Sequence, residues 1–481
     1  MPSYDFDIGI IGGGAGGLTV AAGASQLGAK TLLIEKEREL GGDCLHFGCV
    51  PSKTLIRTAN VYHIMKKAGD FGLPAFDGKP VNFRDISQRI RSVIGAIQRH
   101  DSKERFCRLG VRVEFGYSFF KDEHAVNLNG KTLSARTWVI ATGSSPSIPV
   151  INGLDKMPYL TNRELFSLDA LPDSLIIIGG GPIGIEMAQA FCRLGSRVSV
   201  IQRGRQILSK EDADISEDIM NFLAAEGVIF HLNTSIIAAR DLGGEKEIVV
   251  KKDNGTLNLR AKAVLIATGR DANLRCLGLE EIGIEFDRRR LKLDRRLRTS
   301  HPHIYAAGDV TGDYQFTHAA GYEGGVVLGN AIFHIPRKVD YTFFPWCTFT
   351  DPELACIGMN EKMAAEAGIE YIVYVEKFID NDRSIAEGEK EGKIKMILDM
   401  KEKLLGVQIL GPHAGDLLSE WVAVMNGGVG LATLASSVHP YPTLGEINKK
   451  VVADLFSKKI FSDRVRKGLT FLFDLKGRAC P

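Results

Sequence analysis

Two glycine-rich turns, each lying between a short apolar strand and a helix, limit the folds open to this chain more than any other feature. The first follows a strand predicted over residues 7–11, and its glycines have the spacing G-x-G-x-x-G at Gly12, Gly14 and Gly17. A helix of small residues is expected from Leu18 to about Leu27, then a strand over 31–34 that ends at Glu35. This order of elements predicts a βαβ unit that binds a dinucleotide.

The residue types of this unit suit a nucleotide. Glycines allow the backbone to approach a pyrophosphate at a helix N-terminus, where free N–H groups and the helix dipole favour anions. Glu35 lies about 20 residues past the glycines, the place of an acid that accepts hydrogen bonds from a ribose. The alternative, an ordinary tight strand-to-helix turn, does not explain the acid.

The pattern recurs in the middle of the chain. A strand over 174–178 runs into a second glycine turn, then a helix ends at about Leu194 and a strand follows over 197–201. The glycines of this turn are Gly179, Gly181 and Gly184. We therefore expect two dinucleotide sites in one chain.

The second unit differs from the first at the nucleotide ribose. Its second strand is followed by Gln202-Arg203-Gly204-Arg205, with no acid. Arg203 and Arg205 are available for a 2′-phosphate, which favours NADPH over NADH. The alternative is that both arginines are solvated turn residues, and NADH is then the nucleotide.

Two nearly identical segments further support a repeat of the nucleotide-binding unit. Residues 139–143 end in Ala-Thr-Gly at Thr142 and Gly143, and residues 264–269 end in Ala-Thr-Gly at Gly269. Each copy follows its own glycine unit and is expected to be a strand ending in a tight turn.

A pair of cysteines lies between the first unit and the next predicted helix. Cys44 and Cys49 have four residues between them, which is not a zinc spacing. Pro51 suits the first turn of a helix, so Cys49 is expected at or just before a helix N-terminus, where the dipole favours a thiolate. We interpret the pair as redox-active, with Cys49 facing a flavin, Cys44 exchanging with the substrate and Lys53 one turn into the helix. The alternative is two buried structural thiols.

Composition narrows the class of protein. A chain of 481 residues is expected to hold two to four domains. Its 60 Lys and Arg residues nearly balance 58 Asp and Glu residues, which gives no basic bias toward nucleic acid. Eight cysteines are too few for a disulfide framework, and residues 1–7 do not resemble a secretion signal, so we expect a cytoplasmic protein.

Taken together, these segments resemble the pyridine nucleotide–disulfide oxidoreductases, a family that includes mercuric reductase and dihydrolipoamide dehydrogenase. The resemblance covers about residues 4 to 455 and includes the cysteine segment, both glycine units, both Ala-Thr-Gly turns and Ile304-Tyr305-Ala306-Ala307-Gly308-Asp309. It implies that FAD and NADPH (or NADH) are the cofactors. It also implies that Asp309 holds the ribityl chain of FAD, that the segment with Thr317 passes under the flavin, and that Glu186 pairs with Lys53 near the nicotinamide.

The fold implied is α/β, with two Rossmann-like dinucleotide-binding domains, for FAD and NAD(P), and a C-terminal α+β dimerisation domain. The expected division is 1–150 and 273–340 for FAD, 151–272 for NAD(P), 341–455 for the interface and 456–481 for a basic amphipathic tail. We expect a homodimer and no structural metal site.

The last domain departs from the family in one position. In disulfide reductases a histidine directly precedes a Pro-Thr-Leu-x-Glu run and protonates the leaving thiolate. Here the run ends at Glu446, the histidine position is Tyr441, and His439 lies two residues earlier. Tyrosine has a pKa far above neutral, so it is a poor proton donor for this step. Tyrosine resembles mercuric reductase, yet the vicinal cysteine pair that ends that enzyme is reduced here to Cys480.

These observations predict an enzyme that passes electrons from NAD(P)H through FAD and the dithiol to a small-molecule or metal-ion acceptor, in the manner of mercuric reductase. Three alternatives stay open. They are a dihydrolipoamide dehydrogenase-type disulfide reductase, a redox-responsive flavoprotein that binds a partner without turnover, and an NAD(P)H oxidase. Asp43, at a position where the family usually has threonine, is expected to cap a turn.

The tail holds seven Lys and Arg residues between Lys458 and Arg478 against Asp463 and Asp474. Apolar residues recur at helical spacing at Phe461, Val465, Leu469 and Leu472. A basic amphipathic helix of this kind can lie on an anionic membrane surface, at the inner face of the membrane. The alternative is a helix packed on the body of the protein, and we expect this one, since apolar stripes usually bury against their own core.

Overall fold

A computed structural model of the protein describes residues 3–252, 255–477 and 479. The chain forms two compact units. The first unit comprises residues 1–205 and 226–340, and the second comprises residues 206–225 and 341–481. Arg478 and Cys480, which belong to the predicted tail, lie outside the described residues.

The first unit is built around a seven-stranded sheet in the order β3-β2-β1-β6-β5-β4, with β16 pairing with β6. Its strands β1, β2, β3, β6 and β16 pair in parallel, whereas β4 and β5 add an antiparallel edge. The strand bounds are β1 Phe6–Ile11, β2 Thr31–Glu35, β3 Arg112–Phe115, β4 Ser118–Phe120, β5 Ala125–Leu128, β6 Lys131–Ile140 and β16 Ile304–Ala306. Trp138 of β6 is fully buried in the core beneath this sheet.

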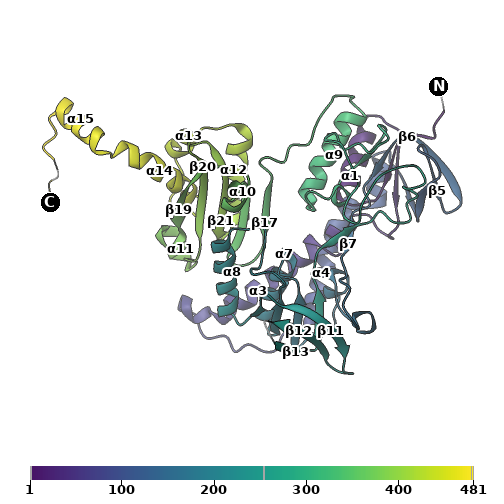
Figure 1. Cartoon of the computed structure of the whole chain (residues 1–481), viewed down its shortest axis with the longest axis horizontal. Helices are drawn as coiled ribbons and strands as arrows, with labels where there is room; N and C mark the ends of the chain where they lie inside the picture. The colour runs from purple at the N-terminus through teal and green to yellow at the C-terminus, as the bar shows by residue number, and fades with distance from the viewer. Residues whose placement is uncertain (1–2, 253–254, 478, 480–481) are drawn as a thin grey trace. The chain divides into compact units, whose positions relative to one another are not determined.

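Two helices lie side by side against this sheet (Figure 1): α1 (Ala15–Gln26), which follows the first glycine turn, and α9 (Thr317–Ala331). Their close approach depends on small residues, because a Cβ at Gly23 would lie 2.3 Å from Leu328. This packing brings the N-terminus of α9, with Thr317, to the same part of the unit as the first glycine turn.

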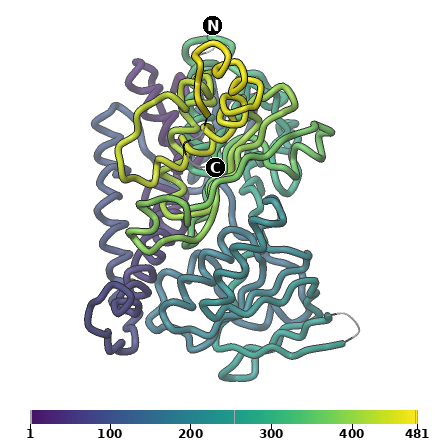
Figure 2. The backbone as a smooth tube through the Cα atoms, turned by 90° about the vertical axis from the view of Figure 1, so that its left-hand side faces the viewer, coloured from purple at the N-terminus to yellow at the C-terminus, as the bar shows by residue number. Residues whose placement is uncertain are grey.

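A second parallel sheet follows in the order β10-β9-β8-β14, and the described part of the first unit also holds two smaller sheets. One is the antiparallel sheet β11-β12-β13, drawn in teal in Figure 2, and the other is the pair β7 and β15. The bounds are β7 Ser144–Pro146, β8 Ser174–Ile178, β9 Arg197–Ile201, β10 Ile229–His231, β11 Ser235–Asp241, β12 Lys246–Lys252, β13 Gly255–Ala261, β14 Ala263–Ile266 and β15 Arg270–Ala272. The pairing of β7 with β15 joins the segments directly after the two Ala-Thr-Gly turns.

The remaining helices of the first unit connect these sheets. They are α2 Gly42–His46, α3 Cys49–Lys66, α4 Phe83–Gln98, α5 Lys103–Arg108, α6 Asn162–Leu165 and α7 Pro182–Leu194, with short 3-10 turns at Ala68–Phe71, Arg99–Asp101, Leu154–Lys156 and Asp309–Thr311. Helix α3 packs on α4, with which it runs side by side in Figure 2, and on α7. The contact with α7 brings the cysteine helix against the helix of the second glycine turn.

The second unit is an antiparallel sheet in the order β17-β18-β21-β20-β19, covered by helices. The bounds are β17 Pro345–Thr348, β18 Glu353–Gly358, β19 Tyr371–Lys377, β20 Lys393–Asp399 and β21 Leu404–Gly411, with helices α8 Ala213–Ala225, α10 Glu361–Glu366, α11 Asp382–Glu387, α12 Ala414–Gly427, α13 Leu431–Ser436, α14 Glu446–Ile460 and α15 Asp463–Phe473, and a 3-10 turn at Phe378–Asp380. Helices α12 and α14 pack on the sheet around buried Trp421. This is an α+β domain, as predicted.

Two helices of the second unit, α8 and α15, are placed differently from what their positions in the sequence indicate. Helix α8 lies within residues 151–272, yet it groups with residues 341–481. Helix α15 was expected to pack on the protein body, but none of its residues is buried. Among the described residues, no helix is both long and apolar enough to cross a membrane.

Candidate functional site: two nucleotide turns and a dithiol

The two glycine turns have the same stereochemistry. Gly12 and Gly179 have φ angles of +112° and +115°, a region that L side chains rarely adopt. A Cβ at Gly12 would lie 2.1 Å from the carbonyl oxygen of Ala141, and a Cβ at Gly179 would lie 2.3 Å from that of Ala267. Both alanines belong to the Ala-Thr-Gly turns, so each Ala-Thr-Gly turn packs directly against the glycine turn of the same nucleotide-binding unit.

The later glycines of each turn also correspond. A Cβ at Gly17 would lie 1.9 Å from the carbonyl oxygen of Gly12, and a Cβ at Gly184 would lie 2.0 Å from that of Gly179. The middle glycines face open space: a Cβ at Gly181 would meet no atom within 4 Å, and one at Gly14 would meet only Gly42 Cα at 3.8 Å. In each turn the first and third glycines are closely packed and the middle glycine faces open space. This arrangement leaves room for a pyrophosphate to contact the backbone of the turn.

The glycine that ends each Ala-Thr-Gly turn also faces open space. Gly143 has a φ of +68° and Gly269 a φ of +120°, and a Cβ at either would meet no atom within 4 Å. Thr142 holds the first turn, since its hydroxyl donates to the Asn273 carbonyl oxygen at 2.7 Å and its own carbonyl accepts from the Asn273 amide at 2.9 Å.

The residue that follows the second strand of each βαβ unit, where an acid is expected, contacts the glycine turn of the same βαβ unit. Oε2 of the buried Glu35 accepts the backbone N–H of Gly13 at 2.6 Å. Next to the second glycine turn Gln202 takes this position, and its amide oxygen accepts the N–H of Gly180 at 3.0 Å. Arg203 and Arg205 follow it with exposed side chains, and neither has an ion-pair partner among the residues that the structure describes. Sequence reasoning noted the missing acid but not the structural role of Gln202.

The cysteine pair joins the short helix α2 to the long helix α3. Cys49 is the first residue of α3 and Cys44 lies within α2. Both are free thiols here, so the structure describes the dithiol form. A hydrogen bond from Cys44 lowers the pKa of Cys49 to about 6, with further lowering by Thr317 and the charge of Lys53 and with burial opposing. The hydrogen bond with Cys49, and then burial, raise the pKa of Cys44.

After Cys44, Thr317 and Lys53 are the neighbours that lower the pKa of Cys49. The sulfur of Cys49 lies 3.3 Å from the Thr317 hydroxyl oxygen, at the N-terminus of α9. Lys53 Nζ lies 2.7 Å from Glu186 Oε2, which comes from α7. Glu186 is buried, so a charged partner is required to hold its carboxylate. The structure thus brings together four predicted site residues, which come from three helices.

Asp43 does not cap a turn, contrary to expectation. Helix α2 has no side-chain cap hydrogen bond, and Asp43 Oδ2 instead accepts from Arg270 Nη2 at 2.7 Å. The amide of Asn162 donates to both carboxylate oxygens of Asp43 at 3.2 Å and to the Phe47 carbonyl oxygen at 3.0 Å. These bonds fix residues 41–48, here called the cysteine loop, which contain the short helix α2 and Cys44.

Arg270 links the cysteine loop to Asp309. Its Nε donates to the Ser144 hydroxyl at 2.7 Å and lies 3.7 Å from Asp309 Oδ2, while the Ser144 hydroxyl donates to that same carboxylate oxygen. Burial raises the pKa of Asp309, and the bond from Ser144 and the charge of Arg270 oppose this effect. Sequence reasoning missed Arg270, although it directly follows the second Ala-Thr-Gly turn.

A buried carboxylate holds the turn that carries Asp309. Glu323 of α9 accepts the backbone N–H of Gly308 at 2.6 Å and the hydroxyl of Thr311 at 3.1 Å. Glu323 is fully buried. The orientation of Asp309 therefore depends on the same helix whose N-terminus contacts Cys49.

The predicted catalytic residues of the second unit each have a separate partner within that unit. His439 Nε2 lies 2.9 Å from Glu420 Oε1, and Glu446 Oε2 accepts the N–H of Thr443 at 3.3 Å. The hydroxyl of Tyr441 donates to Asp382 Oδ2 at 2.9 Å, and Tyr441 is 71% exposed. This hydrogen bond raises the pKa of Tyr441 further above its ordinary value.

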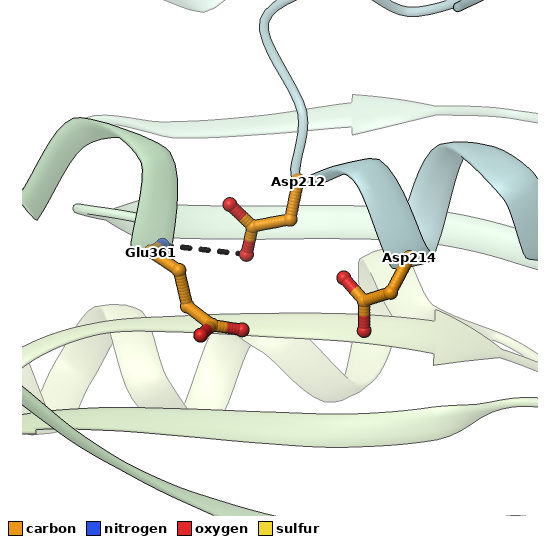
Figure 3. Close-up of side chains that lie close together, drawn as sticks. All are labelled: Asp212, Asp214 and Glu361. Atoms are coloured by element: carbon orange, nitrogen blue, oxygen red, sulfur yellow. Dashed lines mark hydrogen bonds between the residues drawn. The ribbon is translucent and has the colours of Figure 1, made fainter. Parts of the chain in front are cut away.

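The second unit also contains a group of three carboxylates at a separation suited to a metal ion (Figure 3): Asp212, Asp214 and Glu361. The buried ammonium of Lys395 lies 3.0 Å from Asp212 and 2.9 Å from Asp214, and it also pairs with Glu361. Burial alone would lower the pKa of Lys395, but its hydrogen bonds to these carboxylates outweigh burial and raise it. We therefore interpret the group as an ion-pair network.

Two nucleotide cradles, a low-pKa thiol beside a second thiol and an α+β domain define the class of flavin-dependent oxidoreductases that act through a dithiol. The comparisons with known proteins identify the family. Residues 6–324 match the model of the pyridine nucleotide-disulphide oxidoreductases, and residues 344–452 match the dimerisation domain of the same family. The chain belongs to this family.

Its relatives include enzymes with different acceptors. The chain is 34% identical to the mercuric reductase of Streptomyces lividans, covering 95% of this chain and 97% of that one. It is 32% identical to the dihydrolipoyl dehydrogenase of Bacillus subtilis, covering 92% and 96%. Among solved structures, a Cu(II) complex of the HOCl-induced flavoprotein disulfide reductase RclA from Escherichia coli matches with a TM-score of 0.84 at 26% identity, covering 95% and 100%.

The family uses FAD and NAD(P)H, so this chain is an NAD(P)H-dependent flavoprotein disulfide oxidoreductase, and its dimerisation domain indicates a homodimer. The open middle glycines and the two open Ala-Thr-Gly turns fit these dinucleotides.

Proposed function

We propose that this enzyme passes two electrons from NADPH, through FAD and the Cys44–Cys49 pair, to a thiophilic metal ion. We choose a metal ion as the acceptor because Tyr441 stands at the proton-donor position. Its hydroxyl donates to Asp382 and is a poor acid at neutral pH. Release of a thiol from a small disulfide needs a proton donor at this position. Reduction of a metal ion held by sulfur does not.

The roles of the chain's own residues follow from the site geometry. Bound FAD supplies a ring that takes a hydride from a dihydronicotinamide and hands electrons to sulfur. The hydrogen bond from Cys44, and then Thr317 and Lys53, favour the ionised form of Cys49, and Glu186 holds Lys53 in place. Cys44, whose raised pKa keeps it protonated beside the Cys49 thiolate, is the thiol that we assign to exchange with the acceptor. Asp43, Arg270 and Asn162 hold its loop.

Sulfur chemistry supports a metal acceptor. A thiolate is a soft ligand that binds mercuric and cuprous ions strongly. Over one turnover NADPH becomes NADP⁺ and releases one proton, while the acceptor gains two electrons. One mercuric ion becomes the neutral metal, or two cupric ions become two cuprous ions. The mercuric reductase relatives and the Cu(II) complex of RclA agree with this class of acceptor.

A small disulfide is the second candidate. His439, two residues before Tyr441, has a carboxylate partner in Glu420 at 2.9 Å, and a histidine–carboxylate pair is the usual donor to a leaving thiolate. A dihydrolipoyl dehydrogenase relative with 32% identity agrees with this alternative.

To test this proposal, the enzyme is reduced anaerobically with one equivalent of NADPH and then mixed with mercuric ion, cupric ion, lipoamide, oxidised glutathione or a quinone. The rate at which each acceptor reoxidises the enzyme is measured. We expect rapid reoxidation by a metal ion and reoxidation at least tenfold slower by the disulfides. Cys44→Ser should abolish turnover with the metal, whereas Cys107→Ser, which removes an exposed cysteine outside the pair, should not.

Two further variants separate the candidates. Tyr441→Phe should leave metal turnover within about twofold, because the hydroxyl transfers no proton in that reaction. Glu420→Gln should slow only a disulfide reductase. Fast turnover of lipoamide that falls in Glu420→Gln would replace the proposed acceptor with a disulfide, and no reoxidation by any acceptor would favour a redox-responsive binding protein.

A further inference from the structure

The last described helix of the chain, α15, is an apolar and basic helix that its own unit leaves uncovered (Figure 1). It follows α14 after a short turn in which the Ser462 side chain accepts from the N–H of Val465. None of the 11 residues of α15 is buried. Phe471 is 88% exposed and Leu472 is 70% exposed, so α15 leaves large apolar side chains in water.

Three apolar residues of α15 form a stripe along one face, whereas Phe471 follows Lys467 by four residues and lies on the other side. Val465, Leu469 and Leu472 are spaced four and three residues apart, so they lie above one another on the helix surface. Phe473 borders this stripe, and Ile460 and Phe461, both exposed, extend the apolar surface before the helix begins. A continuous apolar surface of this kind, in water, marks a binding face.

The rest of the tail is basic. Residues 458–477 contain six Lys and Arg residues against two Asp residues, a net charge of +4. On α15 itself, Arg464 and Lys467 lie away from the apolar stripe, and neither has an ion-pair partner in the described part of the chain. Arg466 pairs only with the neighbouring Asp463, which is also exposed. The charges are therefore available to an anionic partner.

We propose that α15 is a peripheral membrane anchor, which lies in the plane of an anionic lipid surface with Val465, Leu469 and Leu472 inserted below the headgroups. Charge complementarity carries the choice of partner. An amphipathic helix with one apolar face and a Lys/Arg-rich polar face is the form that binds an anionic bilayer interface. A second copy of α15 would bring the same positive charges together, which disfavours pairing of two tails. At 11 residues, α15 is about 16 Å long, about half the thickness of a bilayer core, so it lies on the membrane and does not cross it.

The experiment uses the full-length holoenzyme and sedimentation with lipid vesicles. Neutral vesicles of phosphatidylcholine are compared with vesicles that also contain phosphatidylglycerol. We expect at least tenfold tighter binding to the anionic vesicles, and at least a tenfold loss of that binding in high salt, because salt screens exposed charges.

Two variants test the two faces of the helix separately. Leu469→Glu with Leu472→Glu should abolish vesicle binding, and Arg464→Gln with Lys467→Gln should remove the preference for anionic lipid. The matched control is Ile237→Glu with Leu257→Glu, which makes the same change at two exposed apolar residues outside the tail. NADPH oxidation in solution should stay unchanged in all three, since none of these residues belongs to the nucleotide or dithiol site.

Three outcomes would overturn the proposal. The first is equal sedimentation with and without vesicles. The second is anionic binding that survives Leu469→Glu with Leu472→Glu, which indicates charge attraction alone. The third is a dimer that dissociates in this variant, measured by analytical ultracentrifugation, which indicates that α15 belongs to the subunit interface. A chain truncated after Ser462 should reproduce the loss of binding without substitutions.

Discussion

The amide oxygen of Gln202 accepts the backbone N–H of Gly180 at 3.0 Å, the same contact that Glu35 makes with Gly13 in the other nucleotide turn. The second turn is therefore held by a neutral group where the first is held by a carboxylate. A carboxylate there would repel a 2′-phosphate, and we propose that the amide followed by Arg203 and Arg205 accommodates one.

The nucleotide preference can be tested at these arginines. Replacing both Arg203 and Arg205 by alanine should raise the KM for NADPH about tenfold and change that for NADH little, because a charge-assisted hydrogen bond contributes about 1.5–3 kcal/mol. Arg197→Ala is the control, since Arg197 is exposed at the other end of the same strand β9. Equal changes for both nucleotides would refute the phosphate-binding role.

The ionisation of Cys49 gives a pH dependence. Because its pKa is lowered to about 6, the reduced enzyme should hold a thiolate at neutral pH and lose it as the pH falls through about 6. The long-wavelength absorption of a thiolate against bound flavin, and the rate of alkylation of Cys49, should both follow this titration.

The main cause of the lowered pKa of Cys49 is the hydrogen bond from Cys44. Cys44→Ala should therefore move the midpoint of the titration upward, toward the ordinary thiol value of 9.0. Cys107→Ala should leave it in place. A midpoint that is unchanged in Cys44→Ala would show that the helix terminus and Lys53 dominate instead.

The Lys53–Glu186 pair should respond asymmetrically to mutation. Lys53→Met leaves the buried carboxylate of Glu186 without its cation, whereas Glu186→Gln leaves a lysine whose side chain is 35% exposed and can be solvated. We expect Lys53→Met to lower the free energy of unfolding by about 1–3 kcal/mol more than Glu186→Gln. Chemical denaturation of the two variants measures this difference, and equal losses would contradict it.

The Asp43–Arg270 ion pair should matter for FAD retention. Asp43→Ala removes the carboxylate that joins the cysteine loop to Arg270 and, through Ser144, to Asp309. We expect faster release of FAD in dilution experiments and a loss of about 1–3 kcal/mol in stability, because Arg270 is mostly buried and loses a charged partner. Asp169→Ala, which removes an exposed pair with Arg84, should change neither quantity.

The sequence determined the local parts of this protein. The predicted strands at 174–178 and 197–201 match β8 and β9, and the helix expected to end at about Leu194 is α7. These predictions succeed because glycine stereochemistry, strand hydrophobicity and a proline in the first turn of a helix act within a few residues of one another. Pro51 likewise predicts a helix that begins near Cys49, and α3 begins at that residue.

Only the tertiary structure decided which distant residues meet. Asp43 and Arg270 are 227 positions apart, and no local pattern indicates that their charges pair. The carboxylates around Lys395 resemble a metal site until this lysine, from strand β20, is placed among them. The exposure of α15 could not be predicted either, because the same amphipathic stripe suits a core or a membrane, and only the packing of the rest of the chain decides between them.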